Sequence, residues 1–195
     1  LVLIDGIVGN DTSTPGGGFN VGIFDVTDVE RVEILKGPQS TLWGSDAIGG
    51  VINIVSKKPD EGVNANVTVA GGSFGAQQYG LSVDGSNSDG DFRMSYSDQS
   101  TDGLSKADEA DGNTEKDGYE NQTLSLKGGV NLTSSARLTL NYRDTESVTE
   151  FDSFGLATGV EDGDEVSEVE FSSAQLSLTF PLSNDRMQNR VTYAD

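Results

Sequence analysis

Oxygen-bearing side chains whose spacing suits a cation are the clearest chemistry in this sequence. Residues 113–118 (NTEKDG) place such side chains at relative positions 1, 3 and 5 with glycine at position 6, as an EF-hand loop does. Position 12 is Leu124 and no helical pattern flanks the loop, so it is not an EF-hand. Residues 144–170 add ten acidic side chains and no basic one. Such a segment folds compactly only with cations or salt, or remains a hydrated acidic loop.

The composition excludes several other kinds of chemistry. The 195 residues contain no cysteine and no histidine, which removes disulfides, thiolate metal sites, the Ser-His-Asp triad and nearly all zinc sites. With 32 acidic and 12 basic residues the formal charge is −20, so there is no basic stripe for nucleic acid. No pair of carboxylates stands in a recognisable catalytic context. We therefore expect neither an enzyme nor a nucleic-acid-binding protein.

The chain after Pro59 alternates apolar and polar residues with the period of a β-strand. The pattern predicts about seven strands in a meander, with short connections near residues 71–75, 84–90, 133–135 and 183–185. Two connections are predicted to be long, at about 98–118 and 147–168. The predicted strands centre on residues 63–69, 79–83, 92–96, 124–132, 138–143, 174–180 and 191–193.

The alternation alone does not distinguish a lipid-facing sheet from a soluble β-sandwich, because a half-buried strand has the same period in both. Three features favour a transmembrane barrel. The strands of about 9–12 residues match what a tilted strand needs to cross a bilayer. The pairing is a continuous meander, and long acidic loops alternate with short turns, as in bacterial outer-membrane barrels.

The first 58 residues follow a different pattern of short apolar runs separated by glycine-rich turns. Val29 to Leu35 alternates apolar and charged residues and predicts a strand. Gln39 to Trp43 predicts one helical turn after Pro38. Val51 to Val55 is a β-branched run that predicts a buried strand in a small mixed core.

Residues 28–59, DVERVEILKGPQSTLWGSDAIGGVINIVSKKP, together with LVLIDG at residues 1–6, resemble the closing section of the plug domain of TonB-dependent outer-membrane receptors. The resemblance implies a mixed fold: the C-terminal part of an α/β plug domain over residues 1–59, then antiparallel strands of a transmembrane β-barrel over residues 60–195. About seven strands make an incomplete barrel. Both ends of the chain lie within strand-like runs, so we expect an internal piece of a receptor.

The resemblance implies an active-transport receptor for a scarce nutrient in the bacterial outer membrane. Its partners are expected to be the nutrient, outer-membrane lipid, and TonB through a box that lies before these residues. Residues 72–97, 117–133 and 140–155 resemble the early barrel of cobalamin receptors within this family, which favours cobalamin or another corrinoid. An iron-siderophore receptor is the alternative within the family. A soluble β-sandwich or adhesin module that binds calcium or sugar is the rival class, and a plugless porin or autotransporter is a second.

Cobalamin receptors bind calcium in two extracellular loops, and the resemblance carries this site onto the acidic residues here. Asp117 and Asp152 align with ligands, Glu115 is a further equivalent, and Asp164 is chosen from the group Glu161, Asp162 and Asp164. Ser105 stands near a position where that family has an aspartate, so the site is partly preserved. The expected cofactor is thus calcium or none.

The polar, glycine-rich loop of residues 10–20 follows the LVLIDG strand, where the family has a loop that contacts substrate. The residues expected to touch substrate are Asn10, Asp11, Thr12, Ser13 and Asn20. A separate group of charged residues is expected to be structural and to lie between plug and barrel wall, namely Glu30, Arg31 and Glu33.

Overall fold

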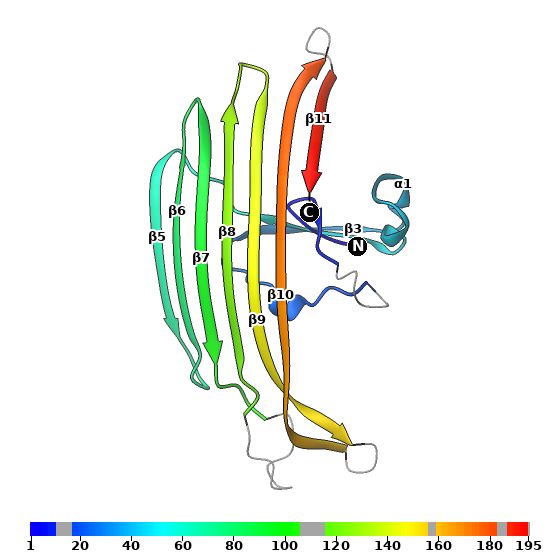
Figure 1. The fold of residues 1–195 in the computed structure, drawn as a ribbon, viewed down its shortest axis with the longest axis vertical. Coiled ribbons are helices and arrows are strands. Elements are labelled where there is room, and N and C mark those ends of the chain that lie inside the picture. The colour runs from blue at the N-terminus through cyan, green and yellow to red at the C-terminus, as the bar shows by residue number, and fades with distance from the viewer. Residues whose placement is uncertain (11–16, 106–115, 156–158, 183–186, 195) are drawn as a thin grey trace.

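A computed structural model describes residues 1–10, 17–105, 116–155, 159–182 and 187–194. The chain forms two sheets, one of four strands and one of seven, and they lie across each other (Figure 1). We call the seven-stranded sheet the wall. No helix among the described residues has the length and apolar character needed to cross a membrane.

The four-stranded sheet has the order β2-β1-β4-β3 and is built from the first 56 residues. Its strands are β1 (Val2–Ile4), β2 (Ile7–Val8), β3 (Val29–Lys36) and β4 (Gly50–Ser56). β1 runs parallel to β4 and β3 runs antiparallel to it, which makes β4 a central strand. A small core of Leu3, Ala47 and Val51 packs on this sheet, each at most 2% exposed.

Three short helices lie among the described residues of this part of the chain. They are η1 (Val21–Ile23), α1 (Ser40–Trp43) and η2 (Ser45–Ala47). The predicted strand before Lys36, the helical turn after Pro38 and the buried strand after Gly50 are thus confirmed. α1 and η2 fill the connection between β3 and β4, where Gly37 and Gly44 adopt positive φ angles.

The wall is a meander in which each strand pairs with its neighbours in the sequence, in the order β11-β10-β9-β8-β7-β6-β5. Seven strands and a sheet that is not closed confirm the predicted fold class. The strands are β5 (Gly62–Gly71), β6 (Gln77–Ser86), β7 (Gly90–Thr101), β8 (Tyr119–Asn131), β9 (Arg137–Gly155), β10 (Gly159–Leu182) and β11 (Met187–Ala194).

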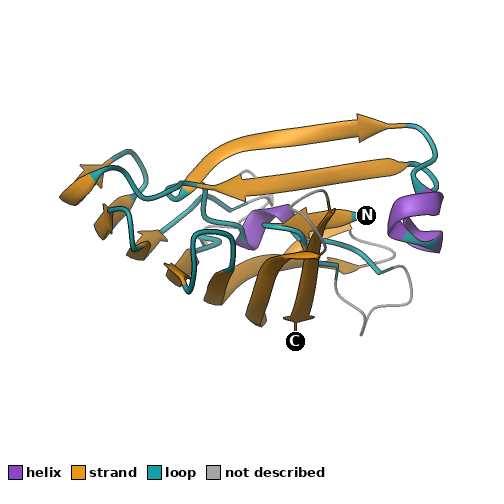
Figure 2. Ribbon diagram, turned by 90° about the horizontal axis from the view of Figure 1, so that it is seen from above, coloured by secondary structure: helices purple, strands orange, loops and turns teal. Residues whose placement is uncertain are grey.

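The wall exposes its apolar side chains and buries its polar ones, which is the opposite of a sheet in a soluble protein. Its apolar side chains are exposed: Val63 is 78% exposed, Met94 50% and Leu140 47%. Its buried side chains are polar or charged, and the four-stranded sheet lies on this polar side (Figure 2). Within the described residues no second sheet covers the apolar face, so the structure does not form the dry interior of a β-sandwich.

The prediction of a long loop at residues 147–168 is wrong. β9 and β10 stay paired up to Gly155 and Gly159, with one irregularity between Glu161 and Glu165. Hydrogen bonding between the two backbones outweighs the mutual repulsion of the carboxylates along this ribbon. The other long connection remains, between Thr101 and Tyr119.

Gly50 occupies a position that a side chain does not fit. Its φ is +140°, and a Cβ there lies 2.5 Å from the Leu35 carbonyl oxygen on the paired strand. Gly50→Ala is expected to distort the β3–β4 pairing at a cost of about 1–3 kcal/mol. Hydrogen exchange of the β4 amides in the full-length protein measures this as a loss of protection.

Gly49→Ala is the matched control. Gly49 has no neighbour within 4 Å of a built Cβ, and its φ is not positive. Equal loss of protection in both variants contradicts the steric account.

Candidate functional site: the polar interface between plug and wall

Residues 20–28, which we call the inner segment, connect the glycine-rich loop to β3 and lie against the polar face of the wall. In Figure 1 the segment lies between the four-stranded sheet and the end of the wall where β9 and β10 extend. Asn20 begins η1 by accepting a hydrogen bond from the Gly22 amide at 3.0 Å. The extended residues after η1 then present Asp25 and Asp28, both 4% exposed, to the wall.

A buried ion-pair triad anchors the end of the inner segment. The Arg93 guanidinium of β7 binds Asp28 through Nε and Nη2, each 2.8 Å from Oδ1, and binds Asp84 of β6 through Nη1 at 2.6 Å. The three side chains are at most 8% exposed. Asp84 also accepts a hydrogen bond from the Asp60 amide at 3.0 Å, so the triad joins the inner segment, the wall and the residues that lead into β5.

Asp25 makes the second anchor with neutral partners. Its carboxylate accepts hydrogen bonds from the Ser97 hydroxyl at 2.5 Å and the Gln99 amide at 2.6 Å, both on β7. The Thr27 amide and hydroxyl donate to the same carboxylate and close a local turn. Thr27 in turn accepts a hydrogen bond from Gln78 of β6 at 2.9 Å.

The start of the inner segment is held by β8 and β9. Tyr119 donates its hydroxyl to the Gly22 carbonyl, and Asn121 donates its amide to the Ile23 carbonyl, both at 2.8 Å. The Arg143 guanidinium lies 4.8 Å from the centre of the Phe24 ring, a cation–π distance. Neither of its Nη atoms has a hydrogen-bond partner within the described residues.

The four-stranded sheet makes its own contact with the wall at the β1–β2 turn. Lys127 of β8 forms an ion pair with Asp5 at 3.1 Å. Asp5 accepts hydrogen bonds from the Ser56 amide and hydroxyl at the end of β4. A separate cavity of about 620 Å³ lies between the inner segment, residues 57–60 and β5–β7, and most of the residues that line it are polar or charged. Water in this cavity can reach the contact between the inner segment and the wall.

The structure shows how the expected substrate-contacting residues are used. Both amide atoms of Asn10 bind backbone: the oxygen accepts from the Val2 amide at 2.7 Å, and the nitrogen donates to the Gly17 carbonyl at 2.6 Å. Asn20 caps η1. Asp11, Thr12 and Ser13 lie outside the described residues. A substrate contact by this loop remains a prediction.

The structure describes the side chains of only some of the expected calcium ligands. Glu115 lies outside it, and Asp164 is described only as backbone in β10. The Gly118 amide donates to a Glu150 carboxylate oxygen at 2.9 Å, and the Glu150 amide donates to the Gly118 carbonyl. These bonds place the backbone at Asp117 beside the part of β9 that leads to Asp152. Among the described residues no group of three carboxylates is close enough to hold a metal.

The charged residues of β3 pair mainly with one another, and their expected place between plug and barrel wall remains a prediction. Glu30, Arg31 and Glu33 have side chains 39–45% exposed, and Arg31 pairs with both glutamates. The Asn53 amide donates to Glu33 at 3.0 Å, and this bond, with the one from Arg31, holds the pKa of Glu33 below its ordinary value.

The residues that bind the two parts together were missed. Asp25 and Asp28 stand in an unremarkable sequence, FDVTDVE. Arg93 was the one residue from which this contact could have been predicted, because it is a charged residue in a strand that crosses lipid in the predicted fold. A buried cation there needs an anionic partner.

Comparisons with known proteins agree with this arrangement. Residues 1–51 match the family model of the TonB-dependent receptor plug domain. The vitamin B12 transporter BtuB of Photobacterium profundum is 31% identical over 199 residues, covering 100% of this chain and 30% of that protein. BtuB of Vibrio vulnificus is 28% identical over 191 residues, covering 97% and 31%.

Solved structures share the fold. The siderophore receptor PiuA from Acinetobacter baumannii superposes with a TM-score of 0.71 at 20% identity, covering 99% of this chain and 28% of that one. The chain thus spans about a third of the length of the curated relatives that it matches.

Arg93→Met tests the buried triad. It leaves Asp28 and Asp84 buried without a cation, at a cost of roughly 3–5 kcal/mol. Amide exchange across residues 20–28 of the full-length receptor is expected to quicken by about a hundredfold or more, since each 1.4 kcal/mol is about a factor of ten.

Arg31→Met removes an exposed arginine that also pairs with two carboxylates, and it is expected to change this exchange little. If the two variants behave alike, the triad does not hold the inner segment.

Proposed function

We propose that this chain, which belongs to the TonB-dependent receptors, forms plug and wall of an outer-membrane receptor that imports a scarce nutrient. The observation that carries the proposal is the buried, ion-paired contact between the inner segment and the polar face of the wall. A polar face toward a plug and an apolar face outward are what a filled transmembrane barrel requires.

The mechanism that follows is transport by displacement of the plug and not catalysis. Hydrogen bonds and ion pairs hold the plug in place, and water can take over each of them when the plug is pulled. Energy reaches the plug from TonB, through a segment of the receptor outside these residues. The relatives that the chain matches are transporters, which supports a role without chemical turnover.

Cobalamin or a related corrinoid is the substrate that the similarity favours. Two relatives matched across nearly all of this chain are named vitamin B12 transporters. An iron-siderophore is the alternative, because a siderophore receptor shares the fold. One fold serves many ligands, so structural similarity alone does not choose between them.

Ligand binding to the full-length receptor separates these two substrates. Cyanocobalamin is expected to bind with at least a hundredfold higher affinity than any member of a ferric-siderophore panel, as measured by titration calorimetry. Binding of a siderophore without cobalamin binding overturns the corrinoid assignment and leaves the transport proposal in place.

Calcium binding at the outer end of β8 and β9 is a second part of the proposal, with Glu115, Asp117, Asp152 and Asp164 as ligands. It rests on the likeness to cobalamin receptors and on the pairing that brings residue 117 alongside β9. Oxygen ligands on loops of this kind suit Ca²⁺.

Protease cleavage of the connection between β7 and β8 reports on the calcium site. Calcium is expected to slow cleavage relative to chelator in the wild type and to lose this effect in an Asp117→Asn, Asp152→Asn double variant. Asp89→Asn, in an exposed turn between β6 and β7, is the matched charge control. Equal cleavage with calcium and chelator in the wild type removes the site.

A further inference from the structure

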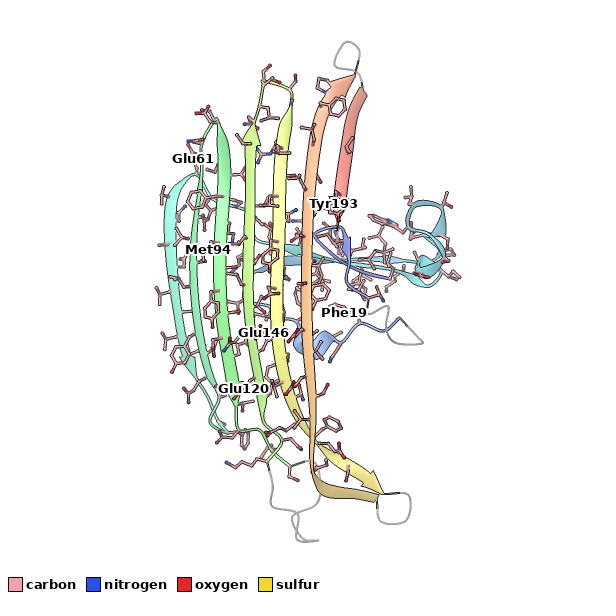
Figure 3. All side chains as sticks on the ribbon, viewed as in Figure 1. Phe19, Glu61, Met94, Glu120, Glu146 and Tyr193 are labelled. Carbon is pink, nitrogen blue, oxygen red and sulfur yellow. The ribbon has the colours of Figure 1, made fainter. Side chains whose placement is uncertain are left out.

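The basic residues of strands β5 to β10 all lie on the polar face of the wall. There are four of them, Arg93, Lys127, Arg137 and Arg143. Alternation places each one on the side of its strand that also carries the buried serines and threonines. The outward side of these strands carries acidic residues instead, such as Glu146, which Figure 3 shows toward the end where β9 and β10 extend. In a chain with a formal charge of −20, positive charge is thus collected along the inside of the wall.

The strand register places these cations in a line along the wall, which we call the cation track. Arg93 and Lys127 lie directly opposite each other, and Lys127 faces Asn141 of β9. Arg143 lies two residues beyond Asn141, toward the end where β9 and β10 extend, and Arg137 lies four residues away in the other direction. From Arg143 to Arg137 the track is about 20 Å long. Because longer loops mark the outer end of such a barrel, Arg143 is the outermost cation.

Open space follows the cation track on the side of the plug. A cavity of about 400 Å³ is lined by Lys127 and Arg137, and by Lys58 from the segment that leads out of the plug. Serine, threonine, asparagine and glutamine side chains of β9 and β10 also line it. A small hollow lined by Arg143 shares Lys127 with this cavity. The cations therefore border space that a ligand group can enter.

Two cations of the track are paired with carboxylates of the plug. Arg93 binds Asp28, and Lys127 binds Asp5. Arg137 binds an aspartate of β7, within the wall itself. Displacement of the plug, as proposed above, takes Asp28 and Asp5 away from their partners. The wall then needs other anions, because a cation that is held away from bulk water without a partner is costly.

Arg143 has no carboxylate partner among the described residues even with the plug in place. It is 4% exposed, and neither Nη atom donates a hydrogen bond to them. Asp28, Asp5 and Asp25 are near enough to act on it electrostatically, yet none forms an ion pair with it. Its contact with the Phe24 ring, at 4.8 Å, uses the face of the ring and no oxygen acceptor. A guanidinium with both Nη groups unused is suited to bind an oxyanion through two parallel hydrogen bonds.

We propose that the cation track binds an oxyanion carried by the nutrient, such as a phosphate ester, while the nutrient passes the plug. This inference rests on the transport role proposed above and adds the class of substrate to it. Arg143 binds the oxyanion first, when movement of the inner segment uncovers it. Lys127 follows once Asp5 has left with the plug. One anion replaces another at each cation, so no cation of the wall is left without a partner during transport.

The spacing of the track allows this transfer. Arg143 and Lys127 are one strand and two residues apart, or about 8 Å between Cα atoms. Both side chains are long, so an oxyanion can contact the second before it leaves the first. Lys127 and Arg137 are about 14 Å apart by the same measure, and the cavity lined by both spans this interval.

Uptake of two corrinoids by cells with the full-length receptor tests the proposal. Cyanocobalamin carries a phosphodiester and dicyanocobinamide carries none. Arg143→Gln is expected to lower the rate of cyanocobalamin uptake about tenfold without changing its binding at the cell surface, because the contact forms only in transit. Uptake of dicyanocobinamide is expected to stay within about twofold of the wild type, since it has no oxyanion to lose.

Two further variants separate charge from structure. Arg143→Lys keeps the cation and is expected to keep most of the cyanocobalamin uptake. Arg31→Gln removes an exposed arginine of the plug that lies off the track, and it is expected to change neither uptake. Equal loss for both corrinoids in Arg143→Gln, or unchanged uptake of cyanocobalamin, overturns the proposal.

Ion selectivity tests the cation track without any nutrient. The full-length receptor is placed in a planar bilayer, its plug is displaced with urea, and the reversal potential is measured in a KCl gradient. The permeability ratio of chloride to potassium is expected to fall at least about twofold in Arg143→Gln relative to the wild type. An unchanged ratio overturns the track. The expected fall in a receptor that binds neither corrinoid nor siderophore rejects the proposed function and leaves the track standing.

Discussion

The fold depends on the wall having its polar face inward and its apolar face outward. In water this arrangement would leave large apolar side chains such as Met94 and Leu140 in solvent while burying Arg93, Asp84 and Asn121. It is stable only where the outer surroundings are apolar and the inner space contains a polar partner. The inner segment supplies that partner with Asp25, Asp28 and its backbone carbonyls.

A polar contact also suits the displacement of the plug that we propose. Separating two apolar surfaces exposes both to water, and the hydrophobic effect opposes this separation throughout the movement. Separating Asp28 from Arg93 exchanges protein partners for water, so each step is offset by hydration. The neighbouring polar cavity gives water access to this contact.

The sequence predicted the wall well because the period of two is a direct consequence of strand geometry. It located the strands of residues 63–180 and the short turns between them. It was wrong at 147–168, where a dense run of carboxylates suggested a loop. Backbone pairing continues there because the repulsion between the carboxylates is weaker than the hydrogen bonding of the two strands.

The contacts between the two sheets could be predicted less well than the strands. Asn10 and Asn20, which are expected to touch substrate, use their side chains to fix local backbone, and their contact with substrate remains a prediction. Asp28 and Arg93 are 65 positions apart, and nothing in their local sequence pairs them. Such contacts depend on how two separate sheets meet, which no periodicity encodes.

Carbene footprinting from a diazirine on the acyl chain, in the reconstituted full-length receptor, tests the central claim most directly. The account predicts labelling at the outward residues Leu81, Met94 and Leu126, with none at their inward neighbours Ser82, Ser95 and Ser125. Labelling of the serines, or an unlabelled Met94 beside labelled positions elsewhere in the receptor, contradicts it.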